Sequence, residues 1–249
     1  YPIADYSLTP TVAIVDPALV LTVPGFVAAD TGMDVLTHAT EAYVSQMASD
    51  YTDGLALQAI KLVFENLESS VKNADFHSRE KMHNASTIAG MAFANAFLGI
   101  SHSMAHKIGA QFHTVHGRTN AILLPYVIRY NGTRPAKTAT WPKYNYYRAD
   151  EKYQDIARML GLPASTPEEG VASYAKAVYE LGERVGIEMN FKAQGVDEKE
   201  WKEHSRELAF LAYEDQCSPA NPRLPMVDHM QEIIEDAYYG YKERPGRLK

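Results

Sequence analysis

The sequence has little of several features that would point to particular classes of protein. It contains one cysteine, Cys217, in 249 residues, so an internal disulfide is excluded and a reducing, cytoplasmic location is expected. It has no long uninterrupted apolar run, so no membrane-crossing segment is expected. Acidic residues outnumber basic ones, 31 to 24, and the net charge of −7 argues against nucleic acids and anionic membranes as partners.

Familiar catalytic signatures are also missing. There is no Walker loop, no G-x-G-x-x-G, no G-x-S-x-G and no H-E-x-x-H. No neighbouring residues mark Cys217 as a nucleophile, and we expect a buried or bystander thiol. The first residues have neither the basic nor the apolar region of a signal peptide, and no initiator Met. We therefore expect the chain to be a fragment or a processed product.

The apolar periodicity predicts a mostly α domain with a short β remnant at its start. Residues 11–16 are apolar and β-branched, which predicts one buried strand. Residues 131–150 are rich in Pro, Lys and Tyr without a clear period, which predicts a loop. Helical spacing predicts one helix carrying His102 and His106, and further helices at about 28–47, 52–71, 78–97, 120–130, 151–160, 167–186, 197–212 and 225–239.

Metal-capable side chains are concentrated in two stretches. Asp34 and His38 lie four residues apart, as do His102 and His106, and His116 precedes Gly117. Residues i and i+4 share one face of a helix, so each pair can point at one ion. Asp with several His suits Fe(II), Zn(II), Mn(II) or Co(II), and a site with open positions would be catalytic. The alternative is that these are ordinary surface or core residues, and spacing alone leaves it open.

These residues lie in stretches that resemble the metal-binding half of the iron-dependent alcohol dehydrogenases. The matching stretches are GMDVLTHATEAY at 32–43, GISHSMAHKIG at 99–109, and His116-Gly117 followed by 120–121. The resemblance is closer still to the alcohol dehydrogenase part of bifunctional aldehyde-alcohol dehydrogenases. The insertion at 131–153 and the segment DQCSPANPR at 215–223 carry that closer match, and the resemblance covers essentially the whole chain.

The resemblance implies both a fold and a ligand set. The fold would be the helical C-terminal domain of the dehydroquinate synthase-like, iron alcohol dehydrogenase fold at 24–249, with 1–23 as the end of an N-terminal α/β domain and its connector. NAD(H) would be bound mostly by a domain absent from this chain, so the isolated chain is expected to be inactive. His106 would bind beside the nicotinamide and relay a proton. The residues implied to ligate Fe(II), or Zn(II), are Asp34, His38, His102 and His116.

The resemblance also implies the function. We expect NAD-dependent interconversion of acetaldehyde and ethanol in fermentation, by a bifunctional enzyme that forms a homo-oligomer or filament. Phe93, Phe97 and Leu98 would either line a small substrate pocket or simply pack in the core. Two other classes stay open. One is a metal-dependent non-redox enzyme on the same helical half, for which Lys107 and Arg118 are the nearest phosphate-binding residues. The other is a metal-binding or filament-assembly module without activity of its own.

Overall fold

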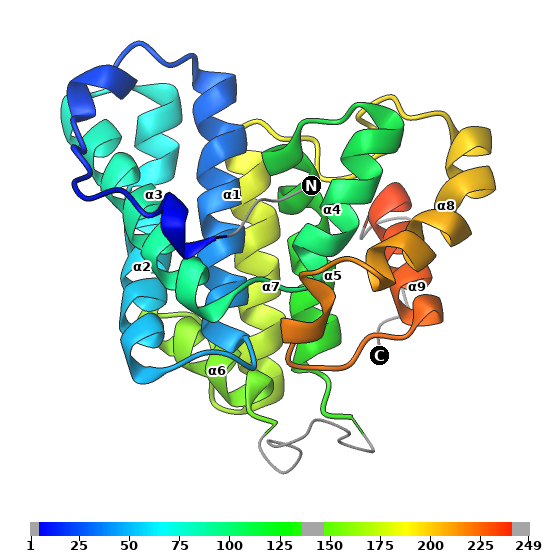
Figure 1. The fold of residues 1–249 in the computed structure, drawn as a ribbon. Coiled ribbons are helices and arrows are strands. Elements are labelled where there is room, and N and C mark those ends of the chain that lie inside the picture. The colour runs from blue at the N-terminus through cyan, green and yellow to red at the C-terminus, as the bar shows by residue number, and fades with distance from the viewer. Residues whose placement is uncertain (1–4, 136–146, 241–249) are drawn as a thin grey trace.

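The computed structural model describes residues 5–135 and 147–240, which fold into helices without a β-strand. The α-helices are α1 (Gly25–Val44), α2 (Asp50–Lys72), α3 (Phe76–Ala96), α4 (Ile100–Phe112), α5 (His116–Gly132), α6 (Ala149–Met159), α7 (Pro167–Arg184), α8 (Glu198–Tyr213) and α9 (Val227–Tyr239). Figure 1 shows α1, α2 and α3 on one side, α4 and α5 in the middle, and α8 and α9 on the other side. The prediction of a mostly α domain is confirmed.

Short polar side chains fix where several of these helices begin. Ser49 and Thr52 form a reciprocal capping box at the start of α2, and Asp75 accepts a hydrogen bond from the backbone of Ser78 at the start of α3. Thr166 caps α7, whose first residue is proline. The helices lie close to their predicted positions, and their ends differ from the predicted ones by a few residues.

The strand predicted at 11–16 is wrong. These residues lie between two short 3-10 helices, η1 (Tyr6–Leu8) and η2 (Pro17–Val20), without strand pairing. Val12 and Ile14 are 74% and 87% exposed, so the run is not buried either. A strand needs a neighbouring strand to satisfy its backbone N–H and C=O groups, and the described part of the chain supplies none.

Helix α5 divides the apolar core into two clusters. One face of α5 packs on α1, α6 and α7 and contributes Ala121, Leu124 and Ile128 to a cluster that also includes residues of α2 and α3. The opposite face packs on α4 and α9 and contributes residues such as Leu123 and Val127 to a cluster that also includes residues of α8. Because both faces of α5 are buried, packing against both clusters fixes the position of the residues in its first turn.

A close backbone contact sets the spacing between α5 and α1. Gly117, the second residue of α5, faces the carbonyl oxygen of Asp30 so closely that a Cβ atom would overlap it. The next residue, Arg118, binds the buried Asp30 carboxylate through Nε at 2.9 Å and through a second nitrogen at 3.1 Å. Only glycine permits this approach, which places the start of α5 against the middle of α1.

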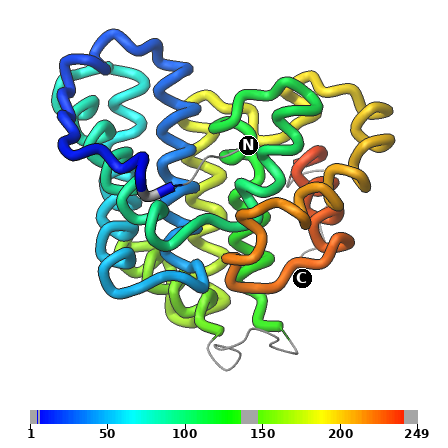
Figure 2. The backbone as a smooth tube through the Cα atoms, in the orientation of Figure 1, coloured from blue at the N-terminus to red at the C-terminus, as the bar shows by residue number. Residues whose placement is uncertain are grey.

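The connector between α8 and α9 is pinned to the ends of α1 and α5. It includes the short helix η3 (Ser218–Ala220), and Figure 2 traces it in orange. The carbonyl of Ala220 accepts from the backbone N–H of Gln46 at 2.9 Å. Asn221 and Asn131 exchange two side-chain hydrogen bonds of 2.8 and 3.0 Å. This buried amide pair holds a turn-rich segment against the centre of the molecule.

The loop predicted at 131–150 is shorter in the structure, because α5 continues to Gly132 and α6 begins at Ala149. Residues 136–146 of that prediction lie outside the described residues. Of the helices in the described ranges, none is by itself both long and apolar enough to cross a membrane. α3 and α4 meet that criterion only when they are taken together, as a pair bent by 107°.

The contact at Gly117 can be tested by adding one methyl group. Gly117→Ala is expected to lower the free energy of unfolding by about 1–3 kcal/mol, because the Cβ forces α5 away from the backbone of α1. Gly54→Ala is the matched control, since a Cβ at Gly54 meets nothing within 4 Å and should stabilise α2 by about 0.5–1 kcal/mol. Urea unfolding of both variants measures the difference. Equal stabilities would show that α5 and α1 are not held at this distance.

Candidate metal centre

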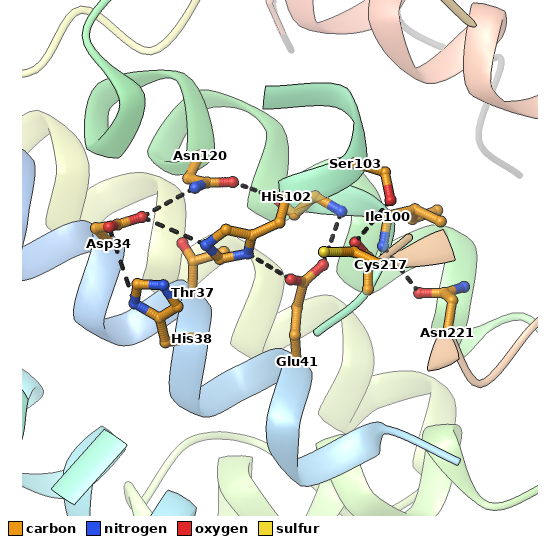
Figure 3. Close-up of polar contacts among 12 residues, drawn as sticks. Asp34, Thr37, His38, Glu41, Ile100, His102, Ser103, Asn120, Cys217 and Asn221 are labelled. Atoms are coloured by element: carbon orange, nitrogen blue, oxygen red, sulfur yellow. Dashed lines mark hydrogen bonds and ion pairs between the residues drawn. The ribbon is translucent and has the colours of Figure 1, made fainter. Parts of the chain in front are cut away.

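Three helices bring one carboxylate and three imidazole rings together. Asp34 and His38 come from α1, His102 from the first turn of α4, and His116 is the first residue of α5. The Asp34 carboxylate lies 3.8 Å from His38 Nδ1, 3.6 Å from His102 Nε2 and 3.6 Å from His116 Nε2. Figure 3 shows His38 and His102 pointing at Asp34 from two helices. The four residues expected to form one cluster therefore do lie together.

The rings of this cluster are packed against one another. His38 stacks on His102, with ring centroids 4.5 Å apart, and its other neighbour is the ring of Phe93, also at 4.5 Å. His102 is 1% exposed and His116 is 44% exposed. The cluster thus has a buried side at His102 and an open side at His116. Such a gradient suits a centre that is held by the protein and reached from solvent.

One unsatisfied atom indicates that the cluster fits a cation. His102 Nε2 is buried and has no hydrogen-bond partner among the described residues, although Asp34 lies 3.6 Å away. An unpaired buried polar atom costs about 1–3 kcal/mol unless something binds it. Ligand atoms of Asp34, His38 and His102 all lie within 4.8 Å of one another. One oxygen and three nitrogen donors suit Fe(II), Zn(II) or a related divalent ion.

Glu41 explains why Nε2 of His102 faces the cluster. It is 2% exposed, and its Oε2 lies 2.6 Å from His102 Nδ1. Because a carboxylate accepts hydrogen bonds, Nδ1 is the donor and Nε2 keeps its lone pair for a metal. Glu41 Oε1 accepts from the backbone N–H of Ser101 at 2.7 Å, so it also caps α4, whose N-cap Gly99 has no side chain.

Asn120 holds the carboxylate of Asp34 in a similar way. Its Nδ2 donates to Asp34 Oδ1 at 2.9 Å and lies 3.2 Å from His116 Nε2. Its Oδ1 accepts from the hydroxyl of Ser101 at 3.2 Å. Asn120 is fully buried one turn after His116, so it links the middle of α1 to the first turns of α4 and α5.

The electrostatics of the cluster agree with a cation site. Burial raises the pKa of Asp34, but the hydrogen bond from His102 and the charges of the nearby histidines lower it overall, well below its usual range. Burial, and then the neighbouring His102, lowers the pKa of His38 to about 3, so that its ring is neutral and able to bind metal. Burial opposes charge on His102 too, but Asp34 and Glu41 raise its pKa to about 9, so a cation that binds Nε2 takes the place of a proton there.

His106 lies beside this cluster but faces another carboxylate. Its ring stacks on His116, with centroids 5.5 Å apart, and is 6.1 Å from His102. Its Nδ1 lies 3.2 Å from Asp215 Oδ2, at the start of the connector after α8. The two helical pairs are therefore unequal: Asp34 and His38 face each other, whereas His102 and His106 face different carboxylates.

Three residues of the site were missed by the sequence reasoning. Glu41 could have been found from its spacing, because it lies seven residues after Asp34 on the same face of α1. The spacing of Asn120, four residues after His116, was a weaker indication. No spacing could have indicated Asp215, since it lies 109 positions after His106. Cys217 is buried as expected, and burial raises the pKa of its thiol.

Comparisons with known proteins identify the family. A family model described as the C-terminal part of the Fe-containing alcohol dehydrogenase family matches residues 28–238, which include all of these site residues. Over all 249 residues the chain is 97% identical to an aldehyde-alcohol dehydrogenase of Streptococcus pneumoniae (strain D39), and it covers 28% of that protein.

More distant relatives indicate the same family. Over 247 residues the chain is 44% identical to the bifunctional aldehyde-alcohol dehydrogenase of Escherichia coli (strain K12), covering 96% of this chain and 28% of that protein. The chain thus spans about a quarter of the length of these relatives. The structure resembles that of an iron-containing alcohol dehydrogenase from Thermococcus thioreducens, with a TM-score of 0.81, 36% identity, and coverage of 95% of this chain and 57% of that one. The chain belongs to the iron-containing alcohol dehydrogenase family and matches the C-terminal domain of that family.

Proposed function

We propose that this domain carries the metal half of an NAD(H)-dependent alcohol dehydrogenase that interconverts acetaldehyde and ethanol. The main support is the unpaired Nε2 of His102, buried and 3.6 Å from a carboxylate that two further imidazoles approach. Several relatives are also named aldehyde-alcohol dehydrogenases. A bifunctional enzyme that contains this sequence would carry out the reaction within a longer protein.

The residues proposed to hold the metal are Asp34, His38, His102 and His116. Fe(II) is the proposed ion, and Zn(II) is the alternative because it binds nitrogen and oxygen donors more tightly. When bound, the ion supplies a Lewis acid that stabilises negative charge on the substrate oxygen. Phe93 packs flat on His38, so it restricts the ring of this proposed ligand and adds an apolar surface beside the centre.

His106 is proposed to move the proton and to bind beside the nicotinamide. Its Nδ1 is engaged by Asp215, so Nε2 is the nitrogen left to exchange a proton with the substrate. In aldehyde reduction Nε2–H donates to the oxygen as hydride reaches the carbon, and in alcohol oxidation Nε2 accepts that proton. The hydride itself comes from or returns to NAD(H).

We propose that NAD(H) is bound mostly by a separate α/β domain, whose end and connector are residues 1–23, while residues 24–249 form the metal-binding domain. The exposed apolar side chains of Val12, Ile14 and Leu19 support this division, because they suit a surface that another domain covers. A sulfoacetaldehyde reductase structure of similar fold was solved with NAD+. Assembly into a homo-oligomer or filament, and a cytoplasmic location, remain proposals.

A phosphate-binding enzyme on the same helical half is less well supported. The two nearby cations are both engaged by buried carboxylates: Arg118 binds Asp30, and Lys107 lies 2.8 Å from Asp215. A phosphosugar would have to compete with these ion pairs. The other alternative, a metal-binding or filament-assembly module without activity of its own, would use the same metal ligands.

An activity assay separates these functions. A full-length enzyme that contains this sequence, purified without oxygen and supplied with Fe(II), should oxidise NADH when acetaldehyde is added, and elemental analysis should find one metal ion per chain. Activity on a phosphosugar with none on acetaldehyde would contradict the dehydrogenase proposal. Full activity of the 249-residue chain alone would contradict the separate NAD(H)-binding domain.

Two histidine substitutions separate ligand from proton relay. His102→Ala should lose metal, with the Kd rising more than about 100-fold, because it removes a fully buried donor. His106→Ala should keep its metal and lose about 100-fold or more in kcat. Metal content by elemental analysis and NADH oxidation rates measure both. Metal loss from His106→Ala would place that residue among the ligands.

Glu41→Gln tests how His102 is oriented. The Gln carbonyl can still accept from Ser101 N–H, but its NH2 group then faces His102 Nδ1 and favours the tautomer that carries hydrogen on Nε2. We expect the metal Kd to rise about 10- to 100-fold. Competition with a chelator measures it, and Glu65→Gln on the exposed face of α2 is the control that removes one negative charge elsewhere. An unchanged Kd in Glu41→Gln would show that Glu41 only caps α4.

A further inference from the structure

The connector after α8 begins with a buried carboxylate that the metal ligands do not use. Asp215 has a side chain that is 4% exposed, and it is the first residue of the segment 215–223. Its Oδ1 accepts from the backbone N–H of Cys217 at 3.0 Å. Its Oδ2 lies 3.2 Å from His106 Nδ1 and 2.8 Å from Lys107 Nζ. Each oxygen therefore has its own set of donors.

We propose that Asp215 is a positioning residue for His106: it accepts the Nδ1–H and fixes the tautomer and rotation in which Nε2 meets the substrate. This inference rests on the proposed function of His106 as proton relay. The ring that Asp215 holds lies flat against His116, with 13° between the ring planes. With Nδ1 turned to Asp215, Nε2 is on the opposite side of the ring, the side left for the substrate.

A second metal site at this point is the main alternative. Ligand atoms of His106, Asp215 and Cys217 lie within 4.8 Å of one another. Lys107, however, already places its ammonium 2.8 Å from the same carboxylate oxygen, and a second cation would be repelled by it. Burial raises the pKa of the Cys217 thiol, so the thiolate that a metal would need is disfavoured. These three residues therefore fit a hydrogen-bonded arrangement that holds the His106 ring better than they fit a second metal site.

The carboxylate has a defined part in each direction of the reaction. In reduction, hydride passes from NADH to the carbonyl carbon and the proton on Nε2 passes to the oxygen, which leaves a neutral imidazole and an alcohol. In oxidation the imidazole takes up the alcohol proton at Nε2, and the resulting positive ring lies against the Asp215 carboxylate. A buried anion at Nδ1 stabilises the charged ring and keeps it from rotating.

Asp215→Asn reverses the polarity of this contact at nearly constant shape. The Asn carbonyl can keep the hydrogen bond from Cys217 N–H, which leaves the NH2 group facing His106 Nδ1. An NH2 group donates, so Nδ1 must accept and the hydrogen moves to Nε2. Lys107→Met is the matched control, because it removes the other partner of Oδ2 and leaves the contact with His106 in place.

The first test is a mutant cycle in a metal-loaded, full-length enzyme. Asp215→Asn should lower kcat for acetaldehyde reduction about 10- to 100-fold, with metal content and KM for NADH unchanged. Lys107→Met should change kcat by less than about 3-fold, as expected for a partly exposed ion pair. Combined with His106→Ala, Asp215→Asn should cost nothing further, because its effect passes through the ring.

Several results would overturn the inference. Additive losses in the double variant, or equal losses in Asp215→Asn and Lys107→Met, would make Asp215 an ordinary structural anchor. Loss of a metal ion from Asp215→Asn, with two ions in the wild type, would establish the second metal site instead. Unchanged kcat in Asp215→Asn would remove any role for the carboxylate.

A second measurement does not depend on activity. Diethyl pyrocarbonate reacts with the unprotonated nitrogen of imidazole, and peptide mapping by mass spectrometry resolves His106 from the other histidines. With Asp215 holding Nδ1–H, Nε2 is free to react, so Asp215→Asn should slow modification of His106 several-fold while Lys107→Met does not. Equal rates in all three proteins would contradict the positioning. Because labelling needs no substrate, an enzyme that proves inactive on acetaldehyde would refute the proposed function and leave this inference to be decided by the labelling.

Discussion

The hydrogen bond between Glu41 and His102 is the contact on which the proposed metal centre depends. It joins α1 to the first turn of α4, is 2.6 Å long, and lies where both side chains are almost fully buried. The same carboxylate accepts from the backbone of Ser101, so one residue of α1 fixes both the start of α4 and the orientation of its histidine. A bare carboxylate could not be buried here without donors to satisfy it, and α4 provides them.

At two places in the site, a buried carboxylate determines which ring nitrogen of a histidine is left without a partner. Glu41 turns Nε2 of His102 towards Asp34, and Asp215 engages Nδ1 of His106. The two histidines share one helix face and are four residues apart, yet they are proposed for different work because different carboxylates face them. The proposed difference in role between the two histidines thus comes from their carboxylate partners and not from the histidines themselves.

Most of the helices were predictable because their signals are local. Apolar spacing and caps such as Ser49, Asp75 and Thr166 act within one or two turns, and the helices appear where these signals are. The strand expected at 11–16 failed for the opposite reason, because pairing with another strand is a property of distant residues. The i,i+4 spacing of Asp34 and His38 made them candidates, whereas no spacing pointed to Asp215, since its contact with His106 spans 109 residues.

The sequence by itself determined the helices, the set of metal-capable residues and, through three matching stretches, the family. It did so because helix formation and i,i+4 spacing depend on neighbours along the chain. Tertiary structure alone decided which nitrogen of His102 and of His106 is free, and that Glu41 and Asp215 hold these rings. These choices depend on distances between helices, which are set by packing such as the contact of Gly117 with the backbone of Asp30.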